Sequence, residues 1–388
     1  MKTNVKPFRF ILALLSLGTC ATAQTLTTLV TFNGGDGDNP QAGLVVSCGT
    51  LYGTTYAGGS SNAGTVFAVN TTGGSFTNVY SFTGGNDGHG PQAGLVLSGN
   101  MLYGTTELGG ASGFGTVFAV NTNGGGFTNV YSFAGGGDGA EPEAGLVLMS
   151  NTLYGTTFIG GQFGEGSVFR VNTNGAAFTN IYSFSGGANG ANPEAGLVLS
   201  GNTLYGTTAN GGNSGWGTVF KVNTNGSGFS SCLFNYTDGA NPQAGLLLSG
   251  NTLYGTTTNG GADGYGAVFQ VGTNLSSIIN LYSFSGGSDG ANPAAGLALV
   301  GNTLYGTTQT ADYGFGYGTV FALNVPALPI PLNIALNGSH VTLSWTNAAF
   351  NLQAATNVAG VYTNMPGATS PYTNAITGAQ QFFRLQEN

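Results

Sequence analysis

One pentapeptide, Leu-Tyr-Gly-Thr-Thr, occurs six times along the chain at nearly constant spacing. Successive tyrosines are 51 residues apart, except that Tyr205 and Tyr254 are 49 apart. An Ala-Gly-Leu block precedes each copy, a Gly-Thr-Val-Phe-like block follows it, and a Tyr-Ser-Phe-like block completes the cycle. A repeat of this length predicts one supersecondary unit per copy, with neighbouring copies sharing a core.

Each cycle predicts four short strands, as the fourth copy illustrates. Strands are expected over residues 195–200, 203–208, 217–222 and 229–234, with turns at Gly201-Asn202 and Asn225-Gly226. Four strands in about 50 residues is the size of a propeller blade. Helical repeats would show a period of 3.6 instead.

The two ends of the repeat region predict how it closes. Leu26–Phe32 has the pattern of a fourth strand with no blade before it, and the last repeat stops after its third strand, Gly318–Asn324. In a ring, the N-terminal strand would complete the last blade and leave no sheet edge open. We therefore predict an all-β, six-bladed β-propeller of four-stranded blades; an open β-solenoid is the alternative.

The segments outside the repeats predict an exported protein of four parts. Residues 1–23 read as a secretory signal peptide, with a basic start, the apolar run Phe10–Leu17 and the cleavage site Ala21-Thr22-Ala23; lipidation at Cys20 is the weaker alternative. The propeller would occupy 24–325, a Pro-rich linker 326–331, and a small β-sandwich-like module 332–388. We expect a monomer that is extracellular, at the cell surface or periplasmic, with no membrane-spanning helix after cleavage.

The repeated Leu-Tyr-Gly-Thr-Thr and Gly-Thr-Val-Phe blocks, over about residues 25–325, resemble the GloVer tandem-repeat family of exported bacterial proteins. That resemblance implies export and a repeat architecture and no particular chemistry. The motifs Leu-Ser-Trp at 343–345 and Gln-Phe-Phe-Arg-Leu at 381–385 resemble a terminal module common in exported proteins of the same bacterial groups. A role of this module in sorting or surface retention is implied by that resemblance alone.

Acidic residues dominate the sparse charge of the chain and gather in two sets of loops. Without residues 1–23, three cations (Arg170, Lys221 and Arg384) face 14 acidic residues, a balance that excludes nucleic-acid binding through phosphates. Every acidic residue except Glu387 lies between a fourth strand and the next first strand, or between a second and a third strand. In an up-and-down blade those connections emerge on one face, which we call the loop face.

Three sets of loop-face residues are candidate ligand-binding groups, because loops that vary on a repeated scaffold are where recognition concentrates. Aromatic residues end the second-to-third-strand loops, and we expect Trp216 and Tyr265 to be well exposed and side by side. Carboxylates and amides beside aromatic rings suit a carbohydrate or a cationic peptide, although Asp in such turns also bonds to nearby backbone N–H groups. The candidates are Phe114, Trp216, Tyr265 and Tyr317; Asp87, Asp138, Asp238 and Asp289; and, after each loop proline, Gln41, Gln92, Glu143, Glu194 and Gln243.

Recognisable catalytic chemistry is sparse. The propeller has one histidine, His89, and no Cys/His cluster with metal-ligand spacing, so no metal or cofactor is predicted. Cys48 and Cys232 fall at different repeat positions, which argues against a disulfide. The leading interpretation is a non-catalytic binding or surface structural module, whose partner is a polysaccharide or cell-surface component. The alternative is a carbohydrate-active enzyme, a glycoside hydrolase or lyase, using Glu143 and Glu194 as an acid–base pair.

Overall fold

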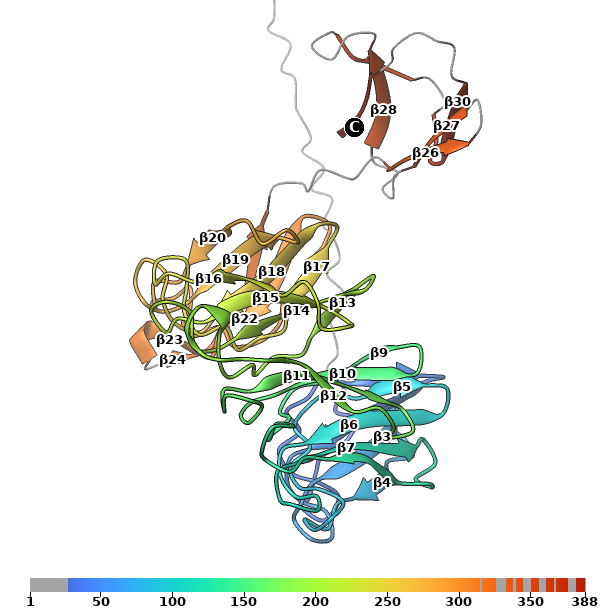
Figure 1. Cartoon of the computed structure of the whole chain (residues 1–388), viewed down its shortest axis with the longest axis vertical. Coiled ribbons are helices and arrows are strands. Elements are labelled where there is room, and N and C mark those ends of the chain that lie inside the picture. Colours follow the sequence, from blue (N-terminus) through green and yellow to red (C-terminus); the bar gives the residue numbers. More distant parts are fainter. Residues whose placement is uncertain are drawn as a thin grey trace, which may run out of the picture.

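The computed structural model describes residues 27–314, 316–325, 333–337, 340–344, 350–355, 361–365, 368–375 and 382–387. The predicted signal peptide, the 326–331 linker and Trp345 lie outside these residues. Within them the protein is an all-β, propeller-like repeat fold of successive antiparallel sheets, which follow one another in chain order from blue to orange (Figure 1). No helix in the described ranges is long and apolar enough to cross a membrane.

Five four-stranded sheets form blades 1 to 5, each in the order first to fourth strand. Blade 1 contains β1 (Val45–Ser47), β2 (Thr50–Thr55), β3 (Thr65–Asn70) and β4 (Thr77–Ser81). Blade 2 contains β5 (Val96–Ser98), β6 (Met101–Thr106), β7 (Thr116–Asn121) and β8 (Thr128–Ser132). Blade 3 contains β9 (Val147–Met149), β10 (Thr152–Thr157), β11 (Ser167–Asn172) and β12 (Thr179–Ser183).

Blade 4 contains β13 (Val198–Ser200), β14 (Thr203–Thr208), β15 (Thr218–Asn223) and β16 (Ser230–Leu233). Blade 5 contains β17 (Leu247–Ser249), β18 (Thr252–Thr257), β19 (Ala267–Gly272) and β20 (Ile278–Ser283). Blade 6 has three strands, β21 (Ala298–Val300), β22 (Thr303–Thr307) and β25 (Val320–Asn324). The loop between β22 and β25 contains the short paired strands β23 (Thr310–Ala311) and β24 (Gly316–Tyr317). The described residues also form the 3-10 turns η1 (Gly187–Asn189) and η2 (Asp312–Gly314).

The short fourth repeat has a structural cause. In blades 1, 2, 3 and 5 the register between the third and fourth strands shifts by a β-bulge, for example between Val66 and Phe67. In blade 4, β15 and β16 pair without that shift, from Thr218↔Leu233 to Lys221↔Ser230. The bulge is one extra residue on one strand. Its loss therefore accounts for one of the two residues by which the Tyr205–Tyr254 spacing is shorter.

The buried side chains lie between neighbouring blades. Phe82 of blade 1 packs edge-to-face on Phe118 of blade 2, with ring centroids 5.1 Å apart. The glycine of Leu-Tyr-Gly-Thr-Thr makes room for this ring, because a Cβ on Gly104 would lie 2.6 Å from Phe118 Cζ. The same pairing recurs along the chain, with Phe133 on Phe169, Phe184 on Phe220, Phe234 on Phe269 and Phe284 on Phe321.

Backbone contacts repeat at these junctions as well. Between blades 2 and 3, Thr105 Oγ1 donates to Ala144 O at 3.1 Å, and Glu141 N donates to Phe114 O at 3.0 Å. A Cβ on Gly145 would lie 3.4 Å from Gly94 O, so the backbone segments that enter the first strands of these two blades pack closely. Each junction thus needs a specific surface from both of its repeats.

The loop face is confirmed by a bridge within each repeat. The connection that enters a blade forms an isolated antiparallel bridge with that blade's second-to-third-strand loop. The six bridges are Asp38↔Ala57, His89↔Leu108, Ala140↔Ile159, Ala191↔Asn210, Ala240↔Asn259 and Ala291↔Thr310. The two loop sets that carry the acidic residues therefore lie together.

The ring closure predicted from the chain ends is not observed. Among the described residues β25 pairs with β22 alone, and residues 27–32 belong to no strand. Tyr305 of blade 6 is 41% exposed, whereas its five counterparts in the other repeats are buried. On the opposite side Leu44 of blade 1 is 53% exposed, although the equivalent Leu95 and Leu146 are buried.

The C-terminal module consists of two three-stranded sheets. One contains β26 (Asn333–Asn337), β27 (His340–Ser344) and β30 (Tyr372–Ala375). The other contains β29 (Thr363–Asn364), β28 (Phe350–Ala355) and β31 (Phe382–Glu387). Leu343 of the first sheet and Leu352 of the second are fully buried in one cluster, so the two sheets share a small core.

Candidate functional site

The loop aspartates accept hydrogen bonds from groups in and beside their own turns. Asp87 accepts hydrogen bonds from Tyr80 OH at 3.0 Å and from the backbone N and Oγ1 of Thr83. Burial, followed by this hydrogen bond to Asp87, raises the pKa of Tyr80 to about 12. The arrangement recurs at Asp138 with Tyr131 and at Asp289 with Tyr282.

Asp238 differs from these three, because Asn235 Nδ2 and the Asn235 side-chain oxygen organise its turn instead. A carboxylate that satisfies turn N–H groups and a tyrosine hydroxyl is part of the turn. The four predicted aspartates therefore shape the loop face.

The aromatic set divides into exposed and half-buried members. Phe114 is 39% exposed and Tyr317 is 96% exposed. Trp216 and Tyr265 do not meet the expectation of strong exposure, because both are half-buried against the cores between blades. Trp216 packs on Tyr236 with centroids 5.0 Å apart, and Tyr265 covers Gly286 and contacts Tyr313.

The position of these aromatic residues explains their burial. Their backbone carbonyls each accept a hydrogen bond from the next repeat: Trp216 O from Asn241 N at 2.9 Å, and Tyr265 O from Asn292 N at 2.8 Å. This bond holds the residue beside the neighbouring blade, and the ring packs on nearby loop residues, as Tyr265 does on Gly286. The ring adds area to the junction, so neither residue is the well-exposed ring that the sequence suggested.

The residues that follow the loop prolines converge with others into one cluster, which we call the inner-mouth cluster. It comprises Tyr56, Gln92, Glu107, Glu141, Glu143, Glu194 and Gln243, contributed by blades 1 to 5 and the connections between them. Gln92 Nε2 lies 3.4 Å from Glu107 Oε2, and Glu107 also bonds to Tyr56. On the other side Glu194 bonds to Gln243, whose Oε1 accepts a 2.8 Å hydrogen bond from Thr258. The predicted Gln41 is exposed.

Glu143 is the electrostatic centre of this cluster. Burial, together with the charges of Glu107, Glu194 and Glu141, raises its pKa to about 7. Burial also raises the pKa of Glu194, while the hydrogen bond with Gln243 opposes that shift. A carboxyl group that is half protonated near neutral pH both donates and accepts hydrogen bonds.

Sequence reasoning missed Tyr56, Glu107 and Glu141 as site residues. Tyr56 and Glu107 occupy the position directly after Leu-Tyr-Gly-Thr-Thr. The residue type at this position varies from repeat to repeat, and that variation could have marked it as a candidate site position. Glu141 has a left-handed φ of 55°, at a position where most other repeats have Asn. Left-handed backbone is unfavourable for Glu relative to Asn or Gly.

The other candidate catalytic and metal-binding residues do not form a cluster within the described part of the chain. No group of three or more His, Cys, Asp or Glu is arranged there to hold a metal ion. His89 contacts Tyr56 edge-on at 6.2 Å, and its Nδ1 is buried without a partner in the described structure. Cys48 and Cys232 are free thiols in different blades.

Comparison with known proteins identifies the repeats. The family described as the Gloeobacter/Verrucomicrobia repeat matches residues 18–204 and 159–371. No curated protein matches the chain.

Comparison with solved structures finds similar chains at low identity. The extracellular domain of a protein classed as a one-component system from B. thetaiotaomicron is 12% identical with a TM-score of 0.51; the match covers 89% of this chain and 43% of that one. A protein classed as a 6-phosphogluconolactonase from Bacteroides uniformis is 16% identical, with a TM-score of 0.44 and coverage of 86% and 98%. An oligogalacturonate lyase in complex with manganese is 8% identical, with a TM-score of 0.47 and coverage of 72% and 74%.

Proposed function

The chain belongs to the Gloeobacter/Verrucomicrobia repeat family, and from that premise we propose that it is an exported, six-bladed ring that acts as a non-catalytic carbohydrate-binding module. Residues 1–23 would be removed on export, so the mature protein would begin at Gln24. The binding site is the inner-mouth cluster. The observation that carries this proposal is a chain of contacts and charge interactions on the loop face. It links Tyr56 and Gln92 through Glu107 to Glu143, and Glu143 through Glu194 to Gln243.

The chemistry of the cluster suits sugar hydroxyl groups. Amides and a partly protonated carboxyl group offer donors and acceptors together, and Tyr56 adds an aromatic face and a hydroxyl. The pKa of Glu143, raised to about 7, means that this carboxyl group is largely neutral below neutral pH. A polysaccharide or another cell-surface glycan is therefore the preferred partner, and a cationic peptide would need the ionised form.

A hydrolase or lyase is the second candidate. An acid catalyst requires a raised carboxyl pKa beside a second carboxyl group, and Glu143 beside Glu194 meets the first requirement. Burial raises the pKa of both carboxyl groups, to about 7 for Glu143, and the hydrogen bond with Gln243 opposes the rise at Glu194. The amides of Gln92 and Gln243 beside them supply no acid–base chemistry, and they favour binding over catalysis.

Binding and hydrolysis can be measured together. A glycan array followed by calorimetry should find a polysaccharide whose affinity falls as the pH rises through about 7, because Glu143 then loses the proton that it donates. Glu143→Gln should keep binding and remove this pH dependence, and Gln92→Ala should weaken binding by about tenfold. Asp263→Asn, on an exposed loop-face residue outside the cluster, is the matched control.

Two outcomes would contradict the proposal. Release of reducing ends that stops in Glu143→Gln would establish the enzyme instead. Binding of cationic peptides alone, strengthening as the pH rises, would replace the carbohydrate with a charged partner.

A further inference from the structure

Two exposed tyrosines on the loop face, Tyr236 and Tyr313, lie outside the inner-mouth cluster. Their side chains are 43% and 65% exposed. Each makes an edge-to-face contact with a half-buried ring: Tyr236 with Trp216 at 5.0 Å and 60°, and Tyr313 with Tyr265 at 6.1 Å and 69°. Trp216 and Tyr265 therefore support two further rings, and much of the surface of those rings is open to solvent.

Both tyrosines flank one loop, which joins the second and third strands of blade 5. On one side Tyr236 O accepts a hydrogen bond from Gly261 N at 2.8 Å, and a Cβ on Gly264 would lie 2.9 Å from the Tyr236 hydroxyl oxygen. On the other side Tyr313 contacts Tyr265 of the same loop. The two exposed rings thus belong to one surface, which we call the aromatic rim.

Tyr236 stands where every other connection that enters a blade has a glycine. Its carbonyl oxygen accepts a hydrogen bond from the second-to-third-strand loop of the blade that follows. The residues that accept the same bond in the other repeats are Gly34, Gly85, Gly136, Gly187 and Gly287. The fold therefore needs no side chain at this place, and the tyrosine is not explained by the packing of the repeats.

Tyr313 has an unfavourable backbone conformation. The second-to-third-strand loop of blade 6 is one residue longer than that of blade 4, measured between the paired threonines at its ends. Asp312 stands where the other repeats have the second glycine of a Gly-Gly pair, and Asp312 and Tyr313 both have left-handed φ values, of 46° and 58°. Bulky residues with a positive φ are uncommon, and such strained residues cluster at functional sites.

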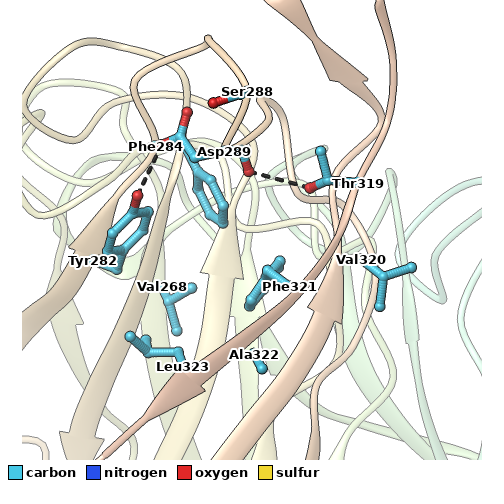
Figure 2. A pocket seen from close by; sticks show the side chains of 10 residues that line it. All are labelled: Val268, Tyr282, Phe284, Ser288, Asp289, Thr319, Val320, Phe321, Ala322 and Leu323. Carbon is cyan, nitrogen blue, oxygen red and sulfur yellow. Dashed lines mark hydrogen bonds between the residues drawn. The ribbon is translucent and has the colours of Figure 1, made fainter.

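The turn that enters blade 6 holds Tyr313 in this conformation. The backbone N–H of Tyr313 donates to Gly286 O in that turn. The turn borders the pocket of Figure 2, where Asp289 accepts a 2.9 Å hydrogen bond from Tyr282 OH, and Asp289 O accepts one from Thr319 Oγ1 at 3.2 Å. A ring fixed in this way loses little conformational entropy when it binds a ligand.

The chemistry of the aromatic rim favours a sugar chain over a protein or an anion. A sugar ring offers C–H groups to the face of an aromatic ring and hydroxyl groups to the polar backbone between the two tyrosines. A protein partner would favour one continuous apolar patch instead. No Lys or Arg lies in the loops of this face, and Asp238 and Asp312 share the loops of the two tyrosines, so an anionic polysaccharide would be repelled.

We propose that the aromatic rim is a second carbohydrate-binding surface, where Tyr236 and Tyr313 stack on the sugar rings of an uncharged polysaccharide. The inference rests on the carbohydrate-binding function proposed above, and it adds a separate site and a ligand class to that function. The inner-mouth cluster forms hydrogen bonds with hydroxyl groups, whereas the rim contributes stacking. Loss of a rim tyrosine therefore weakens binding without changing its pH dependence.

Affinity measurements on the mature full chain test the rim, with soluble β-glucan, galactomannan and polygalacturonate as probes. Tyr236→Ala and Tyr313→Ala should each weaken binding of the neutral polysaccharides by about tenfold, by the same factor below and above the pKa of Glu143. Tyr236→Phe and Tyr313→Phe keep the ring and should keep most of the affinity. The matched control is Phe163→Ala, which removes an exposed loop-face ring of blade 3 and should leave the affinity unchanged.

Fluorescence reports on the rim directly. The chain has two tryptophans, so in Trp345→Phe the emission comes from Trp216, which packs on Tyr236. We expect a saturating neutral polysaccharide to change this emission. The same addition should have much less effect when Trp345→Phe is combined with Tyr236→Ala.

The outcomes separate this inference from the proposed function. Unchanged affinity in both alanine variants, with the loss in Gln92→Ala retained, would remove the rim and leave the proposed function standing. Equal losses in Phe163→Ala would reveal a non-specific apolar effect and overturn the inference. Binding of polygalacturonate as tight as that of the neutral chains would overturn the ligand class, and binding of polylysine that both alanine variants abolish would assign the rim to a cationic protein segment. Binding of no polysaccharide would overturn both proposals.

Discussion

The junction between blades 2 and 3 and the two ends of the repeat array, blades 6 and 1, contain the same residue types in different states. At the first, Tyr103, Leu146 and Phe169 share one buried cluster. At the second, the equivalent Tyr305 and Leu44 are exposed, and β25 has a free edge. Each repeat of this chain therefore contributes half of the core at a junction. Its apolar side chains are buried only where a second repeat packs against them.

The largest expected effect compares Phe169→Ala with Phe321→Ala. Phe169 is fully buried, and its removal should cost about 3–5 kcal/mol in the free energy of unfolding. Phe321 is half-buried in the open arrangement, and closure by residues 26–31 would bury it further. Denaturant unfolding should therefore give losses that agree within about 1 kcal/mol. A loss at Phe321 of less than half that at Phe169 would show that the gap stays open.

A smaller effect is expected from the threonines that bond across the junctions. Thr105→Val removes the 3.1 Å hydrogen bond to Ala144 O and leaves a buried carbonyl unpaired, so unfolding should become easier by about 1–2 kcal/mol. Thr307→Val tests the same bond across the gap, to Ala42 O. Equal losses in thermal unfolding would support the closed ring, and a silent Thr307→Val would count against it.

The smallest effect compares two left-handed residues at equivalent positions, Glu141 and Asn39, both with φ of 55°. Glu141→Asn should stabilise the protein by up to about 1 kcal/mol, because Asn tolerates this conformation better. The reverse change, Asn39→Glu, should destabilise it by a similar amount. Melting temperatures of the two variants should shift in opposite directions, and a loss of stability in Glu141→Asn would reveal that the carboxylate stabilises the inner-mouth cluster.

The pH dependence of stability reports on the inner-mouth cluster and not on the junctions between blades. Because the pKa of Glu143 is raised in the folded state, the native protein binds more protons than the unfolded chain between about pH 4.5 and 7. Stability should therefore fall as the pH rises through that window. Glu143→Gln should flatten this part of the profile, whereas Asp263→Asn should leave its shape unchanged.

Local structure was readable from the sequence because it depends on neighbouring residues. The strand expected over residues 203–208 is β14, and the turn glycines and the loop face were found where the repeat placed them. The 49-residue spacing also reflects the missing β-bulge of blade 4. This cause could be recognised only by comparing the strand registers of the blades. The family followed from the same repeated blocks.

The tertiary structure alone decided the environments that depend on a second repeat. Trp216 and Tyr265 looked free for binding in the sequence, but each is fixed beside the next blade and covers it. The pKa of Glu143 is set by burial and by Glu107 and Glu194, which come from other repeats. Exposure and charge coupling are properties of distances between blades, and a one-dimensional pattern of nearly identical repeats contains no such distances.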